Sequence, residues 1–144
     1  MLHKASAQWQ GGLKDGKGVL STESGALAQN PYSFRTRFEE HGSKAGTNPE
    51  ELIAAAHAGC FSMALSAELG NDGMTAERIS TTATVELHFI DGKPTVTKSH
   101  LHLRAKIPGA DREKFLAAAH RAETGCPISR LLKAEITLDA DLES

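Results

Sequence analysis

Hydrophobic and polar residues alternate in three short runs near the start of the chain. The runs cover residues 4–10, 16–22 and 32–39, and Gly, Asp and Asn-Pro turn residues separate them. Alternation with a period of two between turn formers is typical of half-buried β-strands. The N-terminal region is therefore predicted to be a three-stranded meander.

A long apolar segment then begins after Asn48. Asn48 is a good N-cap residue, Pro49 takes the first helical position and Glu51 the third, and Gly70 marks the end of the segment. The pattern predicts a helix of about twenty residues, or ~30 Å. Because its apolar residues fill more than one stripe, we expect this helix to be central and buried on most sides.

The next segment reads as a β-hairpin. Residues 79–90 and 95–107 are rich in Thr, Val, Ile and Leu, and the turn signal Asp91-Gly92 lies between them. Strand-forming residues on both sides of an Asp-Gly step favour a tight hairpin turn.

The C-terminal part is predicted to hold two helices and a strand. Asp111 caps a helix over residues 112–123, a short helix begins at Pro127, and apolar and polar residues alternate over 134–142. The order of elements indicates the α+β class, and no repeat or interdomain linker is visible. We expect a single domain over residues 1–144.

Composition removes several classes of function. The 144 residues are 40% hydrophobic and 24% charged, with a net charge of −2. This balance gives no electrostatic field that would recruit nucleic acid or an anionic membrane. No stretch approaches the ~18 apolar residues that a membrane span needs, and the N-terminus has no signal-like apolar region. The sequence predicts a soluble, cytoplasmic protein without nucleic-acid or membrane partners.

The chain has two cysteines, Cys60 and Cys126, far apart in the sequence. Such a pair in a reduced cytosol is either inert and buried or active in thiol chemistry. Cys60 lies on an apolar helix face, which raises a thiol pKa, so it needs a nearby cation such as arginine to become a nucleophile. Cys126 precedes Pro127 at a helix start, where backbone amides favour a thiolate.

Several segments closely resemble the osmotically inducible OsmC proteins of the OsmC/Ohr family. The resemblance covers essentially the whole chain, and the residues that carry it lie at 21–25, 36–39, 46–53, 55–62, 125–129 and 133–138. Two separate cysteine motifs and the Asn-Pro-Glu helix start agree, which makes the match specific.

The resemblance implies an OsmC-like fold, an intertwined homodimer with active sites at the subunit interface, and a thiol-dependent peroxidase for organic hydroperoxides in stress defence. It also implies a dithiol reductant of the lipoyl type and no metal or other cofactor. Apolar residues around Cys60 would suit an alkyl or lipid peroxide, and the candidates are Leu52, Ile53, Phe61 and Met63.

Residue by residue, Cys60 matches the peroxidatic cysteine of the family and Cys126 the resolving cysteine. Arg37 matches the arginine that activates the thiol, and Glu50 the carboxylate that orients this arginine. Arg35 competes with Arg37 for the role, because the two would share one face of a strand. The implied cycle passes through a Cys60 sulfenic acid and a Cys60–Cys126 disulfide.

Helix geometry adds a constraint. Glu50 and Cys60 are ten residues apart on one predicted helix, about 15 Å along its axis, which is too far for direct contact. Either a long arginine spans the gap, or the helix of a second copy crosses at a two-fold axis and completes the site.

Two alternatives stay open. His57 and Cys60, at i and i+3, could bind a metal ion together with Cys126 and His120. The chain could also be a non-catalytic, stress-induced protein that binds a small apolar ligand. On the first interpretation His57 is a ligand, whereas we interpret it as a packed helix residue near the site.

Overall fold

The computed structural model describes residues 1–143, so that Ser144, the last residue of the predicted domain, lies outside the described residues. The chain divides into two compact units, Met1–Leu52 and Ile53–Ser144. The prediction of a single domain stays a prediction.

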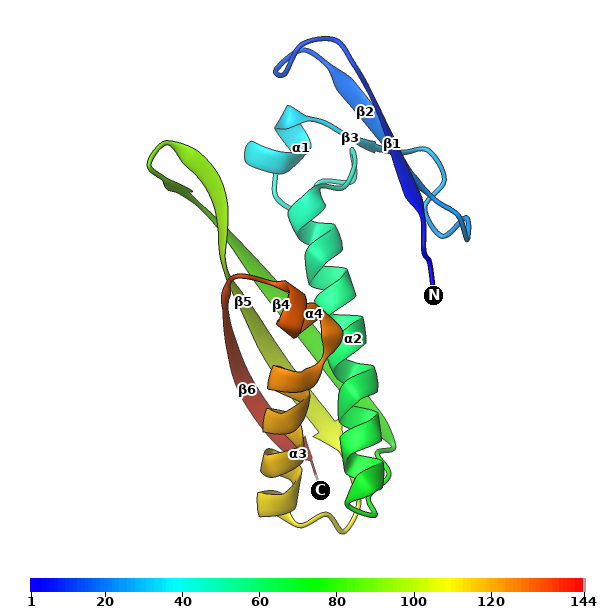
Figure 1. Ribbon diagram of the computed structural model, residues 1–144, viewed down its shortest axis with the longest axis vertical. Coiled ribbons are helices and arrows are strands. Elements are labelled where there is room, and N and C mark those ends of the chain that lie inside the picture. The colour runs from blue at the N-terminus through cyan, green and yellow to red at the C-terminus, as the bar shows by residue number, and fades with distance from the viewer. Residues whose placement is uncertain (144) are drawn as a thin grey trace. The chain divides into compact units, whose positions relative to one another are not determined.

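The first unit contains an antiparallel sheet in the order β1-β2-β3 (Figure 1), formed by β1 (Ala5–Gln10), β2 (Lys17–Thr22) and β3 (Asn30–Tyr32). The predicted meander is confirmed, with the third strand earlier and shorter than expected.

The third predicted strand, residues 32–39, is wrong over most of its length. Helix α1 (Phe34–Phe38) replaces it, and Ser33 is its N-cap. The Ser33 side chain accepts a hydrogen bond from the Thr36 N–H (3.2 Å), and the Thr36 hydroxyl oxygen accepts one from the Ser33 N–H (2.9 Å). This reciprocal capping starts a helix and overrides the alternating pattern.

Helix α2 (Pro49–Asn71) begins where the sequence predicts, because the Asn48 side-chain oxygen accepts a hydrogen bond from the Glu51 N–H at 2.8 Å. Within the chain it is buried along one stripe only, formed by His57, Phe61, Leu65 and Leu69. The expectation of burial on most sides is therefore wrong for the single chain: Met63 on another side is 78% exposed. By length and composition α2 could cross a membrane, a test that core helices of soluble proteins also pass.

The second unit contains a sheet in the order β4-β5-β6, made of β4 (Arg78–Ile90), β5 (Lys93–Lys106) and β6 (Glu135–Glu143). The hairpin between β4 and β5 is confirmed. Asp91 and Gly92 have φ of 50° and 74°, and the two positive values are those that a tight two-residue turn needs. Strand β6 runs parallel to β5.

The core of this unit lies between one face of the sheet and the helices α2, α3 (Arg112–Gly125) and α4 (Pro127–Leu131) (Figure 1). Alternate residues of β5 face this core, and they are Ser99, Leu101, Leu103 and Ala105. The mixed composition of helices and sheets confirms the α+β class.

Candidate functional site

The two cysteines, distant in sequence, are neighbours in the second unit. Cys60 lies in α2 and is half-buried, whereas Cys126, between α3 and α4, is 0% exposed. Cys126 is close enough to raise the pKa of Cys60, and both are free thiols. The fold therefore brings together the two groups that a thiol-disulfide cycle needs.

The surroundings of Cys60 favour the protonated thiol. Burial raises the pKa of Cys60, a hydrogen bond with the backbone of Ile128 lowers it in part, and the neighbouring Cys126 raises it further. Within this unit Cys60 is thus no ready nucleophile, and its activation requires a positive charge from elsewhere.

Cys126 is held in place by its position between two helices. Its backbone N–H donates to the Ala122 carbonyl at the end of α3 (3.0 Å), and its sulfur caps α4 by accepting from the Ser129 N–H at 3.4 Å. Pro127 follows at the first position of α4, where a missing N–H costs nothing. These bonds fix the sulfur at the α4 start.

His57, one turn before Cys60 in α2, is fully buried and hydrogen-bonded at both ring nitrogens. Its Nδ1 lies 2.6 Å from the Ser99 hydroxyl oxygen and its Nε2 lies 2.7 Å from that of Ser129. Burial lowers the pKa of His57, so the imidazole is neutral near pH 7.

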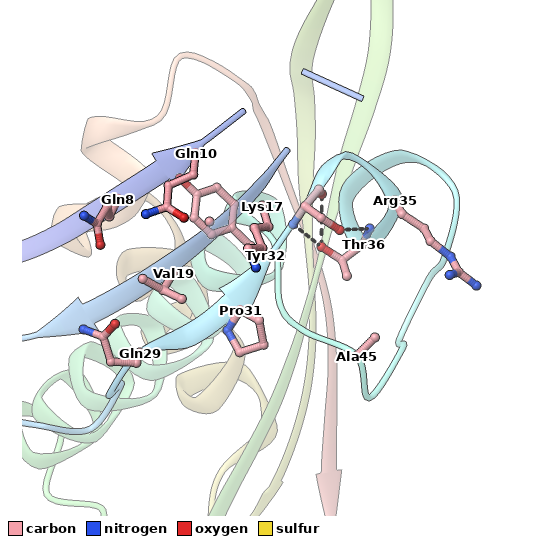
Figure 2. A pocket seen from close by; sticks show the side chains of 12 residues that line it. Gln8, Gln10, Lys17, Val19, Gln29, Pro31, Tyr32, Arg35, Thr36 and Ala45 are labelled. Carbon is pink, nitrogen blue, oxygen red and sulfur yellow. Dashed lines mark hydrogen bonds between the residues drawn. The ribbon is translucent and has the colours of Figure 1, made fainter. Parts of the chain in front are cut away.

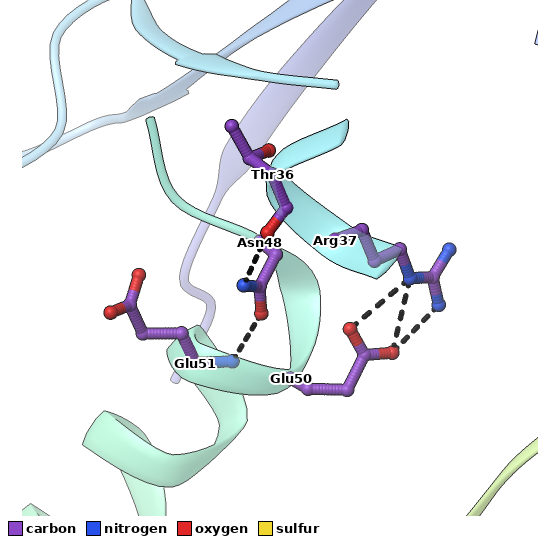
Figure 3. Close-up of polar contacts among 5 residues, drawn as sticks. All are labelled: Thr36, Arg37, Asn48, Glu50 and Glu51. Carbon is purple, nitrogen blue, oxygen red and sulfur yellow. Dashed lines mark hydrogen bonds and ion pairs between the residues drawn. The ribbon is translucent and has the colours of Figure 1, made fainter. Parts of the chain in front are cut away.

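In the first unit, Arg37 and Glu50 form a two-pronged ion pair (Figure 3). The Arg37 Nη2 lies 2.7 Å from Glu50 Oε1, and Arg37 Nε lies 3.1 Å from Oε2. Glu50 is mostly buried, whereas about a third of the Arg37 side chain is exposed. The carboxylate fixes the guanidinium plane and leaves part of it free for another group.

The start of α2 positions this pair. The Asn48 side-chain amide donates to the Thr36 carbonyl at 3.0 Å while its oxygen caps Glu51 (Figure 3). The Thr36 hydroxyl also donates to the Thr47 carbonyl at 2.8 Å. Asn48 therefore ties α1, which carries Arg37, to the first turn of α2, which carries Glu50.

Arg35 does not share a face with Arg37, because both lie on α1 and not on a strand. Arg35 pairs with Glu40, and its side chain is 71% exposed. The expectation of a shared strand face is wrong, whereas the assignment of Arg37 rather than Arg35 to the thiol stays a prediction. The helical turn directs the two arginines to different carboxylates.

An apolar pocket of about 300 Å³ lies beside Arg37. Its lining is mainly aromatic and comprises Trp9, Leu13, Tyr32, Ser33, Phe34, Arg37 and Phe38. The Arg37 guanidinium lies over the Phe38 ring, 5.1 Å from its centre, and Phe34 packs against Phe38. The sequence pattern does not predict this pocket, although four aromatic residues near the N-terminus of an aromatic-poor chain are a signal that could have indicated it.

Two of the apolar residues expected to line a pocket around Cys60, Phe61 and Met63, lie in different surroundings. Phe61 is 0% exposed inside the core of the second unit, so it is a packing residue, and Met63 points to solvent in the single chain.

A larger cavity of about 500 Å³ also lies in the first unit, against β1, β2 and β3. Figure 2 shows polar side chains such as Gln8, Gln10 and Gln29 along it. Its lining contains no cysteine, so it offers no thiol for the chemistry that the two cysteines suggest.

The alternative metal site does not form. His120 lies on α3 with an exposed side chain, and its Nδ1 is 3.0 Å from Glu123. Across residues 1–143, no three side chains of His, Cys, Asp or Glu lie close enough together to hold a metal ion.

Comparisons with known proteins cover both units. A family model described as "OsmC-like protein" matches residues 41–141. Peroxiredoxin OsmC of Escherichia coli is 54% identical over 141 residues, which are 98% of this chain and 96% of that protein. An organic hydroperoxide resistance protein-like relative from Mycoplasma pneumoniae is 31% identical over 94% of this chain and 90% of its own length.

Among solved structures, an organic hydroperoxide resistance protein OsmC from Legionella pneumophila is similar with a TM-score of 0.67 at 26% identity. The match covers 100% of this chain and 99% of that one. The likeness therefore extends over the complete fold of the relative.

Proposed function

The chain belongs to the family of OsmC-like proteins and is a peroxidase of stress defence, and from that premise we propose that Cys60 reduces organic hydroperoxides with Cys126 as its resolving partner. The observation that carries this proposal is that the two thiols are neighbours. Cys60 lies in α2 and Cys126 between α3 and α4, yet Cys126 is close enough to raise the pKa of Cys60.

The first step is attack of the Cys60 thiolate on the hydroperoxide. The sulfur forms a bond to the terminal oxygen, the O–O bond breaks, and the alkoxide leaves and takes up a proton as the alcohol. Cys60 is oxidised by two electrons to a sulfenic acid, and the peroxide is reduced by two.

The second step joins the two cysteines. The Cys126 sulfur attacks the Cys60 sulfur, the S–O bond breaks, and the oxygen leaves as water with the thiol proton of Cys126. A dithiol reductant then opens the disulfide by exchange and is itself oxidised to a disulfide. We assign this role to a dithiol of the lipoyl type.

Activation of Cys60 is the task of Arg37. Because burial and Cys126 raise the pKa of Cys60, the thiolate needs a cation next to it, and Arg37 has a free edge while Glu50 holds its plane. The same guanidinium would stabilise the negative charge that develops on the leaving oxygen. Arg37 and Glu50 thus act together in this step.

The aromatic pocket beside Arg37 supports an organic substrate. It is lined mostly by carbon, so an alkyl or aromatic group would leave water on binding there while the peroxide oxygens meet the guanidinium. Hydrogen peroxide has no such group and gains nothing from the pocket. The names of the relatives from Mycoplasma pneumoniae and Legionella pneumophila agree with this substrate class.

A homodimer completes the proposal. The face of α2 away from its buried stripe exposes small and apolar residues, namely Ala55, Ala56, Gly59, Met63 and Ala67. Small side chains allow two helices to approach closely, and a two-fold axis would cover this face in both copies. We propose that the second copy of the homodimer helps to bring the Arg37–Glu50 pair to Cys60. We also propose that each protomer is a single domain and that the protein is cytoplasmic.

Steady-state turnover tests the function. We expect the purified protein to consume tert-butyl hydroperoxide with dihydrolipoamide, and Cys60→Ser to lose this activity. Cys126→Ser should still react once at Cys60 but fail to turn over with the dithiol. Absence of peroxide consumption in the wild type would favour the non-catalytic binding protein.

A further inference from the structure

A chain of buried and partly buried hydrogen bonds ends on Cys126. It begins at Ser99 in β5, passes through both ring nitrogens of His57 in α2 at 2.6 and 2.7 Å, and reaches Ser129 in α4. The Ser129 hydroxyl oxygen accepts from the Cys126 thiol at 3.3 Å. Three elements of the second unit thus converge on one sulfur.

The proposed cycle releases a proton from the Cys126 thiol, and this series of hydrogen bonds offers an acceptor for it. Cys126 must lose its thiol proton when it attacks oxidised Cys60, and at 0% exposure it has no contact with water. A buried thiol without a proton acceptor is inert.

From donor to acceptor, these hydrogen bonds lead away from the Cys126 sulfur. The Cys126 S–H donates to Ser129. The Ser129 hydroxyl proton is then available to Nε2 of His57, which assigns the imidazole proton to Nδ1, facing Ser99. The Ser129 backbone N–H also donates to the Cys126 sulfur at 3.4 Å and would stabilise the thiolate once it forms.

The charge state of His57 suits an acceptor, because burial lowers its pKa and keeps the ring neutral. The titratable groups that face it are Cys60 on its own helix and Cys126 through Ser129. Lys98 and His100 flank Ser99 in β5, and alternation directs them to the opposite face of the sheet. Arg130 of α4 is exposed.

We propose that Ser129 and His57 form a proton relay that activates Cys126 for attack on Cys60. Ser129 contacts the reacting sulfur, whereas His57 is a positioning residue that acts through Ser129 and is oriented by Ser99. As the Cys126 sulfur forms its bond to the Cys60 sulfur, its proton passes to Ser129 and the Ser129 proton passes to Nε2. The leaving hydroxide then takes up the proton that His57 releases, so that one disulfide and one water result.

This inference rests on the proposed function, but a test without peroxide separates the two. Dithiodipyridine oxidises thiols by exchange and releases one thiopyridone at each step. The more exposed Cys60 reacts first, and Cys126 then attacks the mixed disulfide at Cys60 and releases the second thiopyridone. Cys126→Ser should abolish this second release, which establishes it as a measure of Cys126.

We expect Ser129→Ala to slow the second release on the order of 100-fold, the usual size of general-base assistance, while the first release is unchanged. Ser129→Thr keeps a hydroxyl and should restore most of the rate. In the wild type the second release should fall at acid pH as His57 takes up a proton, and His57→Gln should lose this limb of the pH profile.

Equal rates and pH profiles of the second release in the wild type, Ser129→Ala and Ser129→Thr would overturn the relay. Because Ser129 is only half-buried, its variants keep the test valid if His57→Gln does not fold. A protein that shows the relay but does not consume peroxide would instead refute the proposed function alone.

Discussion

At the scale of single residues, the chemistry depends on how Cys60 loses its proton. Burial and the neighbouring Cys126 raise the pKa of the Cys60 thiol. The cation assigned to lower this pKa is the Arg37 guanidinium, which Glu50 holds. The sequence motifs identified Cys60, Cys126, Arg37 and Glu50 as candidates. They did not reveal the bonds of His57, because its serine partners lie 42 and 72 residues away and no local pattern signals such contacts.

Replacing Arg37 with Gln should raise the pKa of the Cys60 thiol, because the only proposed compensating charge is lost. A nearby opposite charge is worth about 1–3 pKa units, so the rate of Cys60 oxidation at pH 7 should fall roughly 10-fold to 1,000-fold, with its pH profile moved to higher pH. Arg35→Gln is the matched control, since Arg35 pairs with Glu40 on the surface. Stopped-flow kinetics with tert-butyl hydroperoxide measures both, and equal effects of the two substitutions would contradict the role of Arg37.

The buried His57 predicts a pH dependence of stability. Its pKa in the folded state is lowered from 6.5, so the unfolded state binds the proton more readily. Stability is therefore complete above about pH 6.5 and is lost as the pH falls toward the folded pKa, with a slope of at most ~1.4 kcal/mol per pH unit. Urea unfolding of the wild type and His57→Gln at a series of pH values checks this, and identical acid slopes would count against it.

At the scale of elements, helix starts with strong caps were predictable and a short helix was not. The sequence predicts Asn48 and Asp111 as the N-caps of α2 and α3, and in the structure both side chains accept the capping hydrogen bond. The alternating pattern predicts a strand where α1 lies, because five residues show no helical period and the start of α1 depends on the bonds between Ser33 and Thr36. This error matters for the site, since the helix separates Arg35 from Arg37.

Loss of the Asn48 cap should harm activity more than loss of an equivalent cap elsewhere. Asn48→Ala and Asp111→Ala should each lower the free energy of unfolding by about 1 kcal/mol. Only Asn48 also bonds to the Thr36 carbonyl of α1, so only its variant should displace Arg37 and reduce peroxide turnover. Chemical unfolding and turnover, measured side by side, test this, and an equal loss of activity in the two variants would exclude the positioning role.

At the scale of the molecule, the two units carry different parts of the chemistry. The thiols and the His57 chain lie in the second unit, and the Arg37–Glu50 pair with its aromatic pocket lies in the first. The sequence predicted the order of most elements, but not that α2 would bury a single stripe within its own chain. Apolar residues on several sides of α2 indicate that these sides are covered, but they do not identify what covers them. We propose that a second copy of the protein does.

Substitutions on the exposed face of α2 should change the oligomeric state. Met63→Glu places a charge where the second copy would pack and should convert dimers to monomers with loss of turnover. Met63→Leu keeps the surface apolar and should leave both unchanged. Sedimentation equilibrium together with turnover at several protein concentrations measures the effect, and an active Met63→Glu monomer would contradict the shared site.

The central claim is that Cys60 and Cys126 are chemical partners, and mass mapping after a single oxidation tests it most directly. The reduced protein is treated with one equivalent of tert-butyl hydroperoxide and digested without reductant. The account predicts one disulfide-linked peptide pair that contains Cys60 and Cys126, and a Cys60 sulfenic acid alone in Cys126→Ser. Recovery of both cysteines as free thiols, or of overoxidised Cys60 without the linked pair in the wild type, would contradict it.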